Sequence, residues 1–143
     1  MAYRGLTFGL LVILLFVGAP SQAAEISGED AAAIRKVISD QIDAFAHDDG
    51  PRAFSLATRG IQATFGTAEK FMEMVKTQYQ VVYRPNSVQF QKPEIVEGEV
   101  VQPVRMTDAA GGVWLAIYPM VREPGRGWRT NGCLLHRVAG VQT

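Results

Sequence analysis

Six aromatic and basic side chains are the residues of this sequence whose types could line a binding site. They are Tyr79, Tyr83, Arg84, Trp114, Tyr118 and Trp128. Small-molecule pockets are walled by aromatic side chains with a few polar tips, and these residues supply both. The simpler alternative is that they are core aromatics whose hydroxyl and indole groups each reach a neighbour, as buried Tyr and Trp usually do. Tyr83 and Arg84 are the strongest pocket candidates of the six.

His47, Asp48 and Asp49 follow one another at the end of a predicted helix, where they could suggest a metal site or an acid–base pair. A metal ion needs three or four converging ligands, and His136 is the only other histidine of the chain. A histidine near a helix C-terminus is also favoured simply by the helix dipole. We therefore predict no metal ion and no other cofactor.

Three further residues could do chemistry, but each has a simpler structural role. Asp43 would be a general base if burial raised its pKa, yet it lies beside Ile42, off the apolar stripe of its helix, which predicts exposure. Asp108 stands next to a hairpin turn, where Asp is a common turn former. Cys133 lies in an apolar run and is predicted to be an unreactive core residue. The sequence has neither a glycine-rich phosphate loop nor a nucleophile motif, so no catalytic set is predicted.

The first residues have the three parts of a secretory signal. Residues 1–4 carry a positive charge, and residues 6–17 are almost purely apolar. Small residues at Ser21 and Ala23 fit a signal-peptidase site, which predicts cleavage after Ala23 and a periplasmic or secreted protein. The alternative is an uncleaved anchor, but the apolar stretch is shorter than the roughly 20 residues of a membrane-spanning helix.

Removal of residues 1–23 would leave a single domain, residues 24–143, which is long enough to bury a core. The chain has 14 Lys and Arg residues and 14 Asp and Glu residues, and the predicted signal holds Arg4 but no acid, so the mature net charge is −1. Nucleic acids and anionic membrane surfaces attract proteins with a basic excess. We therefore expect neither as a partner of the mature domain.

The first part of the domain has helical periodicity. Ser27 can cap a helix whose apolar residues then recur every three or four positions, and Pro51 suits the first turn of another. Three helices are predicted: from Ser27 to about Phe45, a short one after Pro51, and one from a Thr67 cap to near Tyr79, with a loop at residues 58–60.

Beyond Pro85 the apolar residues alternate, which predicts strands. The predicted strands are 87–91, 95–96, 100–107, 113–121 and 128–137, joined by turns at 97–98, 108–112 and 124–127. Pro103 interrupts the third of these and marks an edge strand or a bulge. Helices followed by antiparallel strands give an α+β domain.

The strand predicted at residues 113–121 is apolar at both alternating sets of positions. An antiparallel strand with one wet face would show polar residues at every second position. One face should therefore pack on the helices, and the other should be covered by a partner subunit, a ligand, the curl of the sheet or the tail at 138–143. We favour a homodimer through the sheet, because two-fold pairs are the commonest oligomers.

The chain after the predicted signal also resembles a family of bacterial proteins known as a domain of unknown function. The similar segments span nearly all of the domain: 34–38, 41–45, 54–57, 61–65, 71–75, 82–85, 114–118 and 128–133. That family is similar to the nuclear transport factor 2-like, ketosteroid isomerase-like (cystatin-like) proteins. The resemblance implies a cone, in which three N-terminal helices pack on a curved antiparallel sheet and a pocket opens at one end. It implies no activity, because that fold hosts isomerases, cyclases, dehydratases and non-catalytic domains.

We interpret the chain as an exported domain that binds a small apolar molecule or a protein partner and has no evident catalytic residues. The six residues named first are the candidate pocket. The alternative is an isomerase- or cyclase-type enzyme that uses Tyr83 with an aspartate. A third hypothesis is a structural interaction module whose cone is filled by its own side chains.

Overall fold

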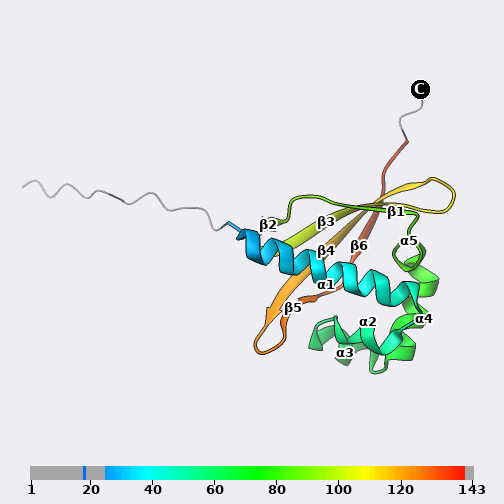
Figure 1. Ribbon diagram of the computed structural model, residues 1–143, viewed down its shortest axis with the longest axis horizontal. Helices are drawn as coiled ribbons and strands as arrows, with labels where there is room; N and C mark the ends of the chain where they lie inside the picture. The colour runs from blue at the N-terminus through cyan, green and yellow to red at the C-terminus, as the bar shows by residue number, and fades with distance from the viewer. Residues whose placement is uncertain (1–17, 19–24, 141–143) are drawn as a thin grey trace, which may run out of the picture.

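The computed structural model describes Gly18 and residues 25–140 (Figure 1). Apart from Gly18, the predicted signal peptide and its cleavage site lie outside the described residues. The elements follow in the order α1 (Gly28–Ala46), α2 (Gly50–Ser55), α3 (Arg59–Phe65), α4 (Ala68–Gln78), α5 (Gln80–Tyr83), β1 (Ser87–Phe90), β2 (Glu94–Val96), β3 (Glu99–Thr107), β4 (Val113–Glu123), β5 (Gly127–Thr130) and β6 (Leu134–Arg137). All the helices precede all the strands, which confirms the predicted α+β class.

The long helix α1 lies across one face of the sheet (Figure 1). It begins where predicted, because Ser27 Oγ accepts a hydrogen bond from Asp30 N (3.0 Å) and so satisfies one of the free amides of the first turn. Ile38 is fully buried and Phe45 is 2% exposed, and both point to the same side of the helix. Within the residues that the structure describes, no helix has the length and apolar character needed to cross a bilayer.

Five helices, rather than the three predicted, precede the sheet in the described part of the chain. The prediction of a loop at residues 58–60 is wrong, because Thr58 caps α3 by accepting a hydrogen bond from Ile61 N (3.3 Å). No residue of α3 is fully buried, so this helix lacks the buried stripe on which the prediction depended. Helix α4 ends near Tyr79 as predicted, and the single turn α5 follows it.

The strands form one curled antiparallel sheet with β3 and β4 at its centre. Strands β1 and β2 both pair with β3 on one side, and β5 and β6 both pair with β4 on the other. The predicted last strand is therefore wrong in one respect. It is split into β5 and β6 by residues 131–133, where Gly132 has a φ of +95° that other residues rarely adopt.

Two bulges at the same level of the central strands accompany this curl. On one side, residues 91–93 lie opposite only residues 102–103 of β3. On the other side, residues 131–133 lie opposite only residues 118–119 of β4. An extra residue on one strand bends it and increases its twist. The bulges therefore account for the curl of the sheet.

Pro103 lies at the first of these bulges, in an interior strand. Its carbonyl accepts a hydrogen bond from Gln91 N (3.1 Å). The nitrogen and the carbonyl of a residue in an antiparallel ladder point to the same side, so the Pro103 nitrogen also faces the bulge, where no donor is required. The predicted bulge is thus present, whereas the predicted edge strand is not.

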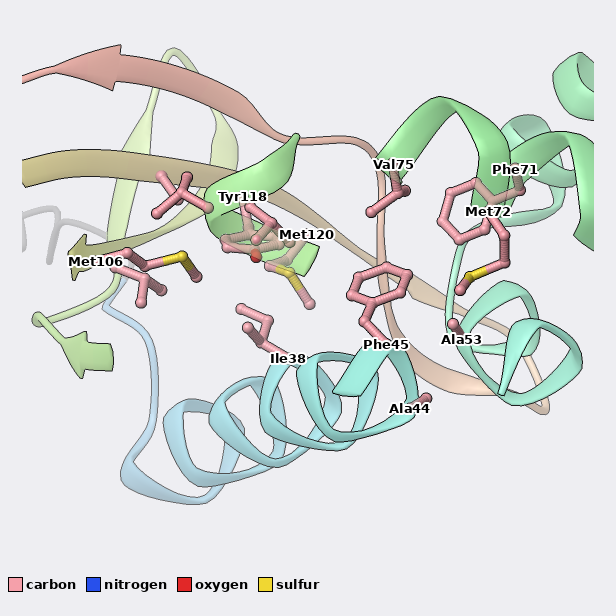
Figure 2. Packing of buried hydrophobic residues seen from close by; sticks show 14 of the residues in the cluster. Ile38, Ala44, Phe45, Ala53, Phe71, Met72, Val75, Met106, Tyr118 and Met120 are labelled. Carbon is pink, nitrogen blue, oxygen red and sulfur yellow. The ribbon is translucent and has the colours of Figure 1, made fainter. Parts of the chain in front are cut away.

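The core lies between α1 and the inner face of the sheet. Figure 2 shows Ile38 of α1 beneath Tyr118 and Met120 of β4, and Phe45 beneath Val75 of α4. Alternate residues of β4 are buried on this side, as expected for a strand packed on a helix.

The outer face of the sheet is also apolar, but it stays partly exposed. Ile117 and Pro119 of β4 are half-buried, and Val121 of the same strand is 39% exposed. Leu134 of β6 pairs with Ile117 and is 57% exposed. The two apolar faces expected from the sequence therefore differ: one forms the core and the other remains available to a partner.

Candidate ligand-binding cavity

A cavity of about 350 Å³ lies among the C-terminal half of α1, helices α3 and α4, and the sheet near the second bulge. The residues that line it are all uncharged: Gln41, Phe45, Ala57, Ile61, Phe65, Phe71, Met74, Val75, Gln78, Tyr79, Val82, Tyr118, Thr130, Gly132 and Cys133. Ile61, Phe65 and Met74 are half-buried and Gln78 is exposed, so we place the mouth of the cavity between α3 and α4.

Three phenylalanines from three different helices form much of the apolar wall. The ring centroid of Phe71 in α4 lies 6.0 Å from that of Phe45 in α1 and 5.7 Å from that of Phe65 in α3. Helix α4 is set by its Thr67 cap, whose Oγ1 accepts a hydrogen bond from Lys70 N (3.2 Å). Helical spacing then places its apolar residues on one face, toward the other two rings.

Hydrogen bonds to the end of β5 fix the start of α3. Thr58 N donates to Thr130 O (2.9 Å), and Thr58 Oγ1 donates to Asn131 Oδ1 (2.9 Å). These bonds join α3 to the second bulge of the sheet. Ile61 and Phe65 are thereby held on the cavity side of the helix.

Tyr118 is the polar group of greatest interest in the cavity. The residue is 2% exposed, and among the described residues its hydroxyl makes no hydrogen bond other than a weak one with the Cys133 thiol. Burial, and then the neighbouring Cys133, raises the pKa of Tyr118 well above its ordinary value, so the group stays a neutral O–H donor.

Gln41 is the second buried polar group in the cavity wall. Its Nε2 donates to Ala53 O (3.0 Å), which fixes the amide between α1 and α2. Its Oε1 makes no hydrogen bond within the described part of the chain and remains an acceptor. Gln41 is 3% exposed, so the amide is presented to the cavity rather than to bulk solvent.

Cys133 lines the cavity from the residues between β5 and β6. The residue is half-buried as a whole, but its thiol lies on the inner side, beside Tyr118. Burial raises the pKa of the Cys133 thiol to about 12, so the thiol is neutral at physiological pH. This supports the prediction of an unreactive core cysteine.

Two of the six predicted pocket residues, Tyr79 and Tyr118, line this cavity together. Tyr79 is half-buried, and its burial, with a contribution from Cys133, raises its pKa. The other four lie elsewhere in the fold.

Tyr83, Arg84 and Trp114 line a separate groove between α5 and the hairpin that joins β3 to β4. The indole of Trp114 donates to Asp108 Oδ2 (2.9 Å). Asp108 also accepts hydrogen bonds from the amides of Ala110 (3.0 Å) and Gly112 (2.8 Å), which confirms it as a turn former.

Trp128 lines neither site and lies at the start of α1. Its Nε1 donates to Asp30 Oδ1 (3.0 Å), and the guanidinium of Arg122 lies 5.8 Å from the centroid of its ring. The side chain therefore ties β5 to the first turn of α1, which is the structural alternative weighed for these aromatics.

Tyr83 is paired with an aspartate on the surface. Its hydroxyl donates to Asp48, which also accepts from Arg84 Nη2 (3.2 Å) and lies 3.7 Å from Lys76 Nζ. The hydrogen bond from Tyr83, aided by both cations, holds the pKa of Asp48 below its ordinary value. Asp48 has a φ of +51°, and Arg84 also donates to Phe45 O. This cluster therefore closes the C-terminal end of α1 and holds an unusual backbone conformation.

Asp43 and His47 occupy the exposed side of α1, as predicted for Asp43. Arg52 Nη1 donates to Asp43 Oδ2 (2.7 Å), and this bond is the main reason that the pKa of Asp43 is lowered. His47 Nδ1 lies 2.9 Å from Asp43 O, at the carbonyl end of the helix. No group of three or more metal-ligating side chains occurs among the residues that the structure describes.

Most residues of the cavity wall were not among the predicted site residues. Gln41 carried a signal, since it is a polar residue on the apolar face of a strongly amphipathic helix. Ile61, Phe65 and Met74 carried none that distinguishes a cavity wall from ordinary core, because only the arrangement of three helices leaves space between them.

A family model described as "Domain of unknown function (DUF4864)" matches residues 27–143 of the chain. No curated protein and no solved structure matches the chain.

Proposed function

The chain belongs to the family of the domain of unknown function DUF4864, and because that description assigns no activity, we propose from the cavity itself that the domain binds a small, neutral and mainly apolar molecule. The observation that carries this proposal is the cavity of about 350 Å³ itself, whose lining side chains are all uncharged and mainly apolar. Ligand pockets combine an apolar wall with a few placed polar groups, and they have volumes of about 300–1,000 Å³. The cavity has both properties.

The uncharged wall favours a neutral ligand. An ion moved out of water into this cavity would lose its hydration without gaining an opposite charge, which is strongly unfavourable. Tyr118 and Cys133 are both neutral at physiological pH, because their pKa values are raised. The wall can therefore offer apolar contacts and hydrogen bonds but no ion pair.

The enzyme alternative has weaker support. The tyrosine–aspartate pair that it needs is formed by Tyr83 and Asp48, but this pair lies outside the cavity. A general base works best with a pKa near the working pH, whereas the pKa of Asp48 is lowered. The pair thus has the features of a helix-end clamp rather than those of an acid–base site.

The fold and the location of the protein form part of the same proposal. We propose that α1 and the curled sheet are a cone of the nuclear transport factor 2-like kind, with the cavity at its open end. The position of α1 across the inner face of the sheet supports this (Figure 1). We also propose that the signal peptide is cleaved after Ala23 and that the domain acts in the periplasm or outside the cell.

Titration with the neutral fluorescent probe N-phenyl-1-naphthylamine tests the binding function. We expect one probe per chain to bind and its emission to rise, because the cavity is apolar. Ile61→Trp should weaken probe binding at least about tenfold, because the larger ring occupies part of the cavity. A loss of about 1.4 kcal/mol in binding free energy is enough for that factor. Ala63→Trp is the matched control, because it adds the same ring to an exposed position of α3. Equal affinities of the two variants would contradict the proposal.

The outer face of the sheet supports a homodimer. Its centre is apolar, with Ile117 and Leu134 side by side. Arg105 lies on this face beside Leu115, toward one end of the central strands, whereas Glu94 lies toward the other. A two-fold axis that runs across the strands would therefore bring the Arg105 end of one copy onto the Glu94 end of the other. We propose that a second copy of the chain covers this face.

Light scattering after size-exclusion chromatography tests the dimer. Wild-type protein should have the mass of two chains, and Leu134→Glu should have the mass of one, because it places a charge at the centre of the apolar contact. Ile95→Glu is the control. Ile95 is exposed, at 40%, as Leu134 is, but its side chain lies on the opposite face of the sheet. A monomeric wild-type protein would refute this assembly.

A further inference from the structure

We infer that the ligand of the cavity carries a neutral hydrogen-bond donor, of the kind found in a phenol or an alcohol, and donates it to Oε1 of Gln41. This inference rests on the proposed binding function and adds the chemical class of the ligand. It assigns to Gln41 the role of holding the one polar end of an otherwise apolar molecule.

One end of the buried Gln41 amide is fixed, and the other end is free. Gln41 is 3% exposed and lines the cavity from α1. Its amide is bonded to Ala53 O (3.0 Å), and because a carbonyl oxygen only accepts, the bonded end must be the NH₂ group. Oε1 is therefore held in place as an acceptor, and it accepts no hydrogen bond from the described residues.

This oxygen is within reach of a molecule in the cavity. In the described part of the chain, the side-chain atoms that are closed off without a nitrogen or oxygen partner are the Tyr118 hydroxyl and Arg129 Nε. Gln41 Oε1 also has no partner but is not one of these atoms, so it keeps accessible surface. Because Gln41 is almost wholly buried and lines the cavity, we assign that surface to the cavity.

A free acceptor in the wall favours a ligand with a donor. Any molecule that fills the cavity takes water away from Oε1, and a buried acceptor that loses its partner is costly. A purely apolar ligand would impose this cost in full. A hydroxyl on the ligand removes it, because the hydroxyl donates to Oε1 in place of water.

The charge of the wall excludes an ionic donor. An ammonium group would donate to Oε1 as well, but no aspartate or glutamate is among the described residues that line the cavity. An ion that is buried without an opposite charge loses its hydration uncompensated. A neutral hydroxyl is far less costly to dehydrate, and it regains one hydrogen bond from Gln41.

The surroundings of Gln41 indicate where the donor lies on the ligand. Gln41 and Phe45 are four positions apart on α1, so their side chains are neighbours on one face of the helix. The ring of Phe71 lies 6.0 Å from that of Phe45, and aromatic rings pack well in tilted or edge-on arrangements. A hydroxyl attached directly to a flat apolar skeleton would therefore reach Oε1 while the skeleton contacts these rings.

Two compounds of nearly the same shape separate the donor from the skeleton. 2-Naphthol carries a hydroxyl that stays protonated at neutral pH, and 2-methylnaphthalene has a methyl group in its place. Each is used to displace N-phenyl-1-naphthylamine from the wild-type protein and from Gln41→Met, and the affinity of the probe is measured separately for each protein. We expect the preference for 2-naphthol to fall about tenfold in Gln41→Met, because methionine has the length of glutamine without its acceptor. The different hydration of the two compounds cancels in this comparison.

Gln62→Met is the matched control. Gln62 Nε2 likewise donates to backbone carbonyls, those of Phe54 (3.0 Å) and Ala57 (3.3 Å), but Gln62 does not line the cavity. This variant should therefore keep the wild-type preference for 2-naphthol.

A second measurement needs no variant. 2-Naphthol should bind the wild-type protein at least as tightly as the more apolar 2-methylnaphthalene, because the hydrogen bond to Gln41 offsets the dehydration of the hydroxyl. Gln41→Met itself should fold, since Ala53 O still accepts a hydrogen bond from Leu56 N (3.3 Å) when the amide is removed.

A preference for 2-naphthol that Gln41→Met lowers and Gln62→Met retains supports the inference. It is overturned if 2-methylnaphthalene binds wild-type protein the more tightly, if Gln41→Met leaves the preference unchanged, or if neither compound displaces the probe. In those cases the binding function still stands as long as Ile61→Trp weakens probe binding. If the probe is insensitive to Ile61→Trp, the proposed function fails and the inference fails with it.

Discussion

Replacement of Phe45 by alanine is expected to lower the free energy of unfolding by about 3–5 kcal/mol. Phe45 is 2% exposed and joins two parts of the structure, because its ring packs in the core and also lines the cavity. The substitution removes the contact with the Phe71 ring and enlarges a space that already exists. The neighbouring elements have little capacity to collapse into it, since α1 is held by α2, α5 and β5.

Chemical denaturation of Phe45→Ala measures this loss. Ser39→Ala, at an exposed position of the same helix, should stay within about 0.5 kcal/mol of the wild type. A loss below 1 kcal/mol for Phe45→Ala would mean that Phe45 is not the anchor of α1 at the cavity.

Replacement of Gln102 by leucine should cost about 1–3 kcal/mol, although leucine is the more apolar residue. Gln102 is 1% exposed, and its Nε2 donates to Gln91 O (2.7 Å) and to Pro103 O (2.8 Å). These bonds close the first bulge of the sheet. Leucine would leave the carbonyl of Gln91 without this donor, and the strand next to β3 would lose its attachment at the bend.

The same unfolding experiment measures the cost, with Gln89→Leu as the control on an exposed position of β1. The control should be nearly neutral. If Gln102→Leu were neutral or stabilising, the amide of Gln102 would not be what holds the bulge.

The parts of the fold that sequence reasoning predicted are those with local causes. Ser27 caps α1 and Thr67 caps α4, and both caps are recognisable from residue type and spacing alone. The turn at Glu97 and Gly98, where both residues have positive φ, was likewise predictable from the local sequence. The missed helices α3 and α5 are short and lack a long apolar stripe, so tertiary contacts decide them.

The division of the last strand had a different cause. Residues 128–137 have one continuous strand-like pattern, and only their pairing with β4 shows that an extra residue lies opposite Tyr118 and Pro119. A bulge of this kind depends on two strands at once. Local sequence patterns describe one strand at a time and therefore do not predict it.

The candidate site was predicted in part for the same reason. Tyr79 and Tyr118 line the cavity, but Trp128 has the same chemical character and instead ties β5 to the first turn of α1 through Asp30. Residue type indicates which side chains suit a pocket. Which of them share a pocket depends on how α3 and α4 are placed against the sheet, and that information is not local.

Native mass spectrometry of the gently purified protein shows whether the cavity holds a small apolar molecule. We expect chains that begin at Ala24 and carry an additional small mass, which is lost from Ile61→Trp and retained by Ala63→Trp. Wild-type protein without any additional mass, together with probe binding that Ile61→Trp leaves unchanged, would contradict the proposed function.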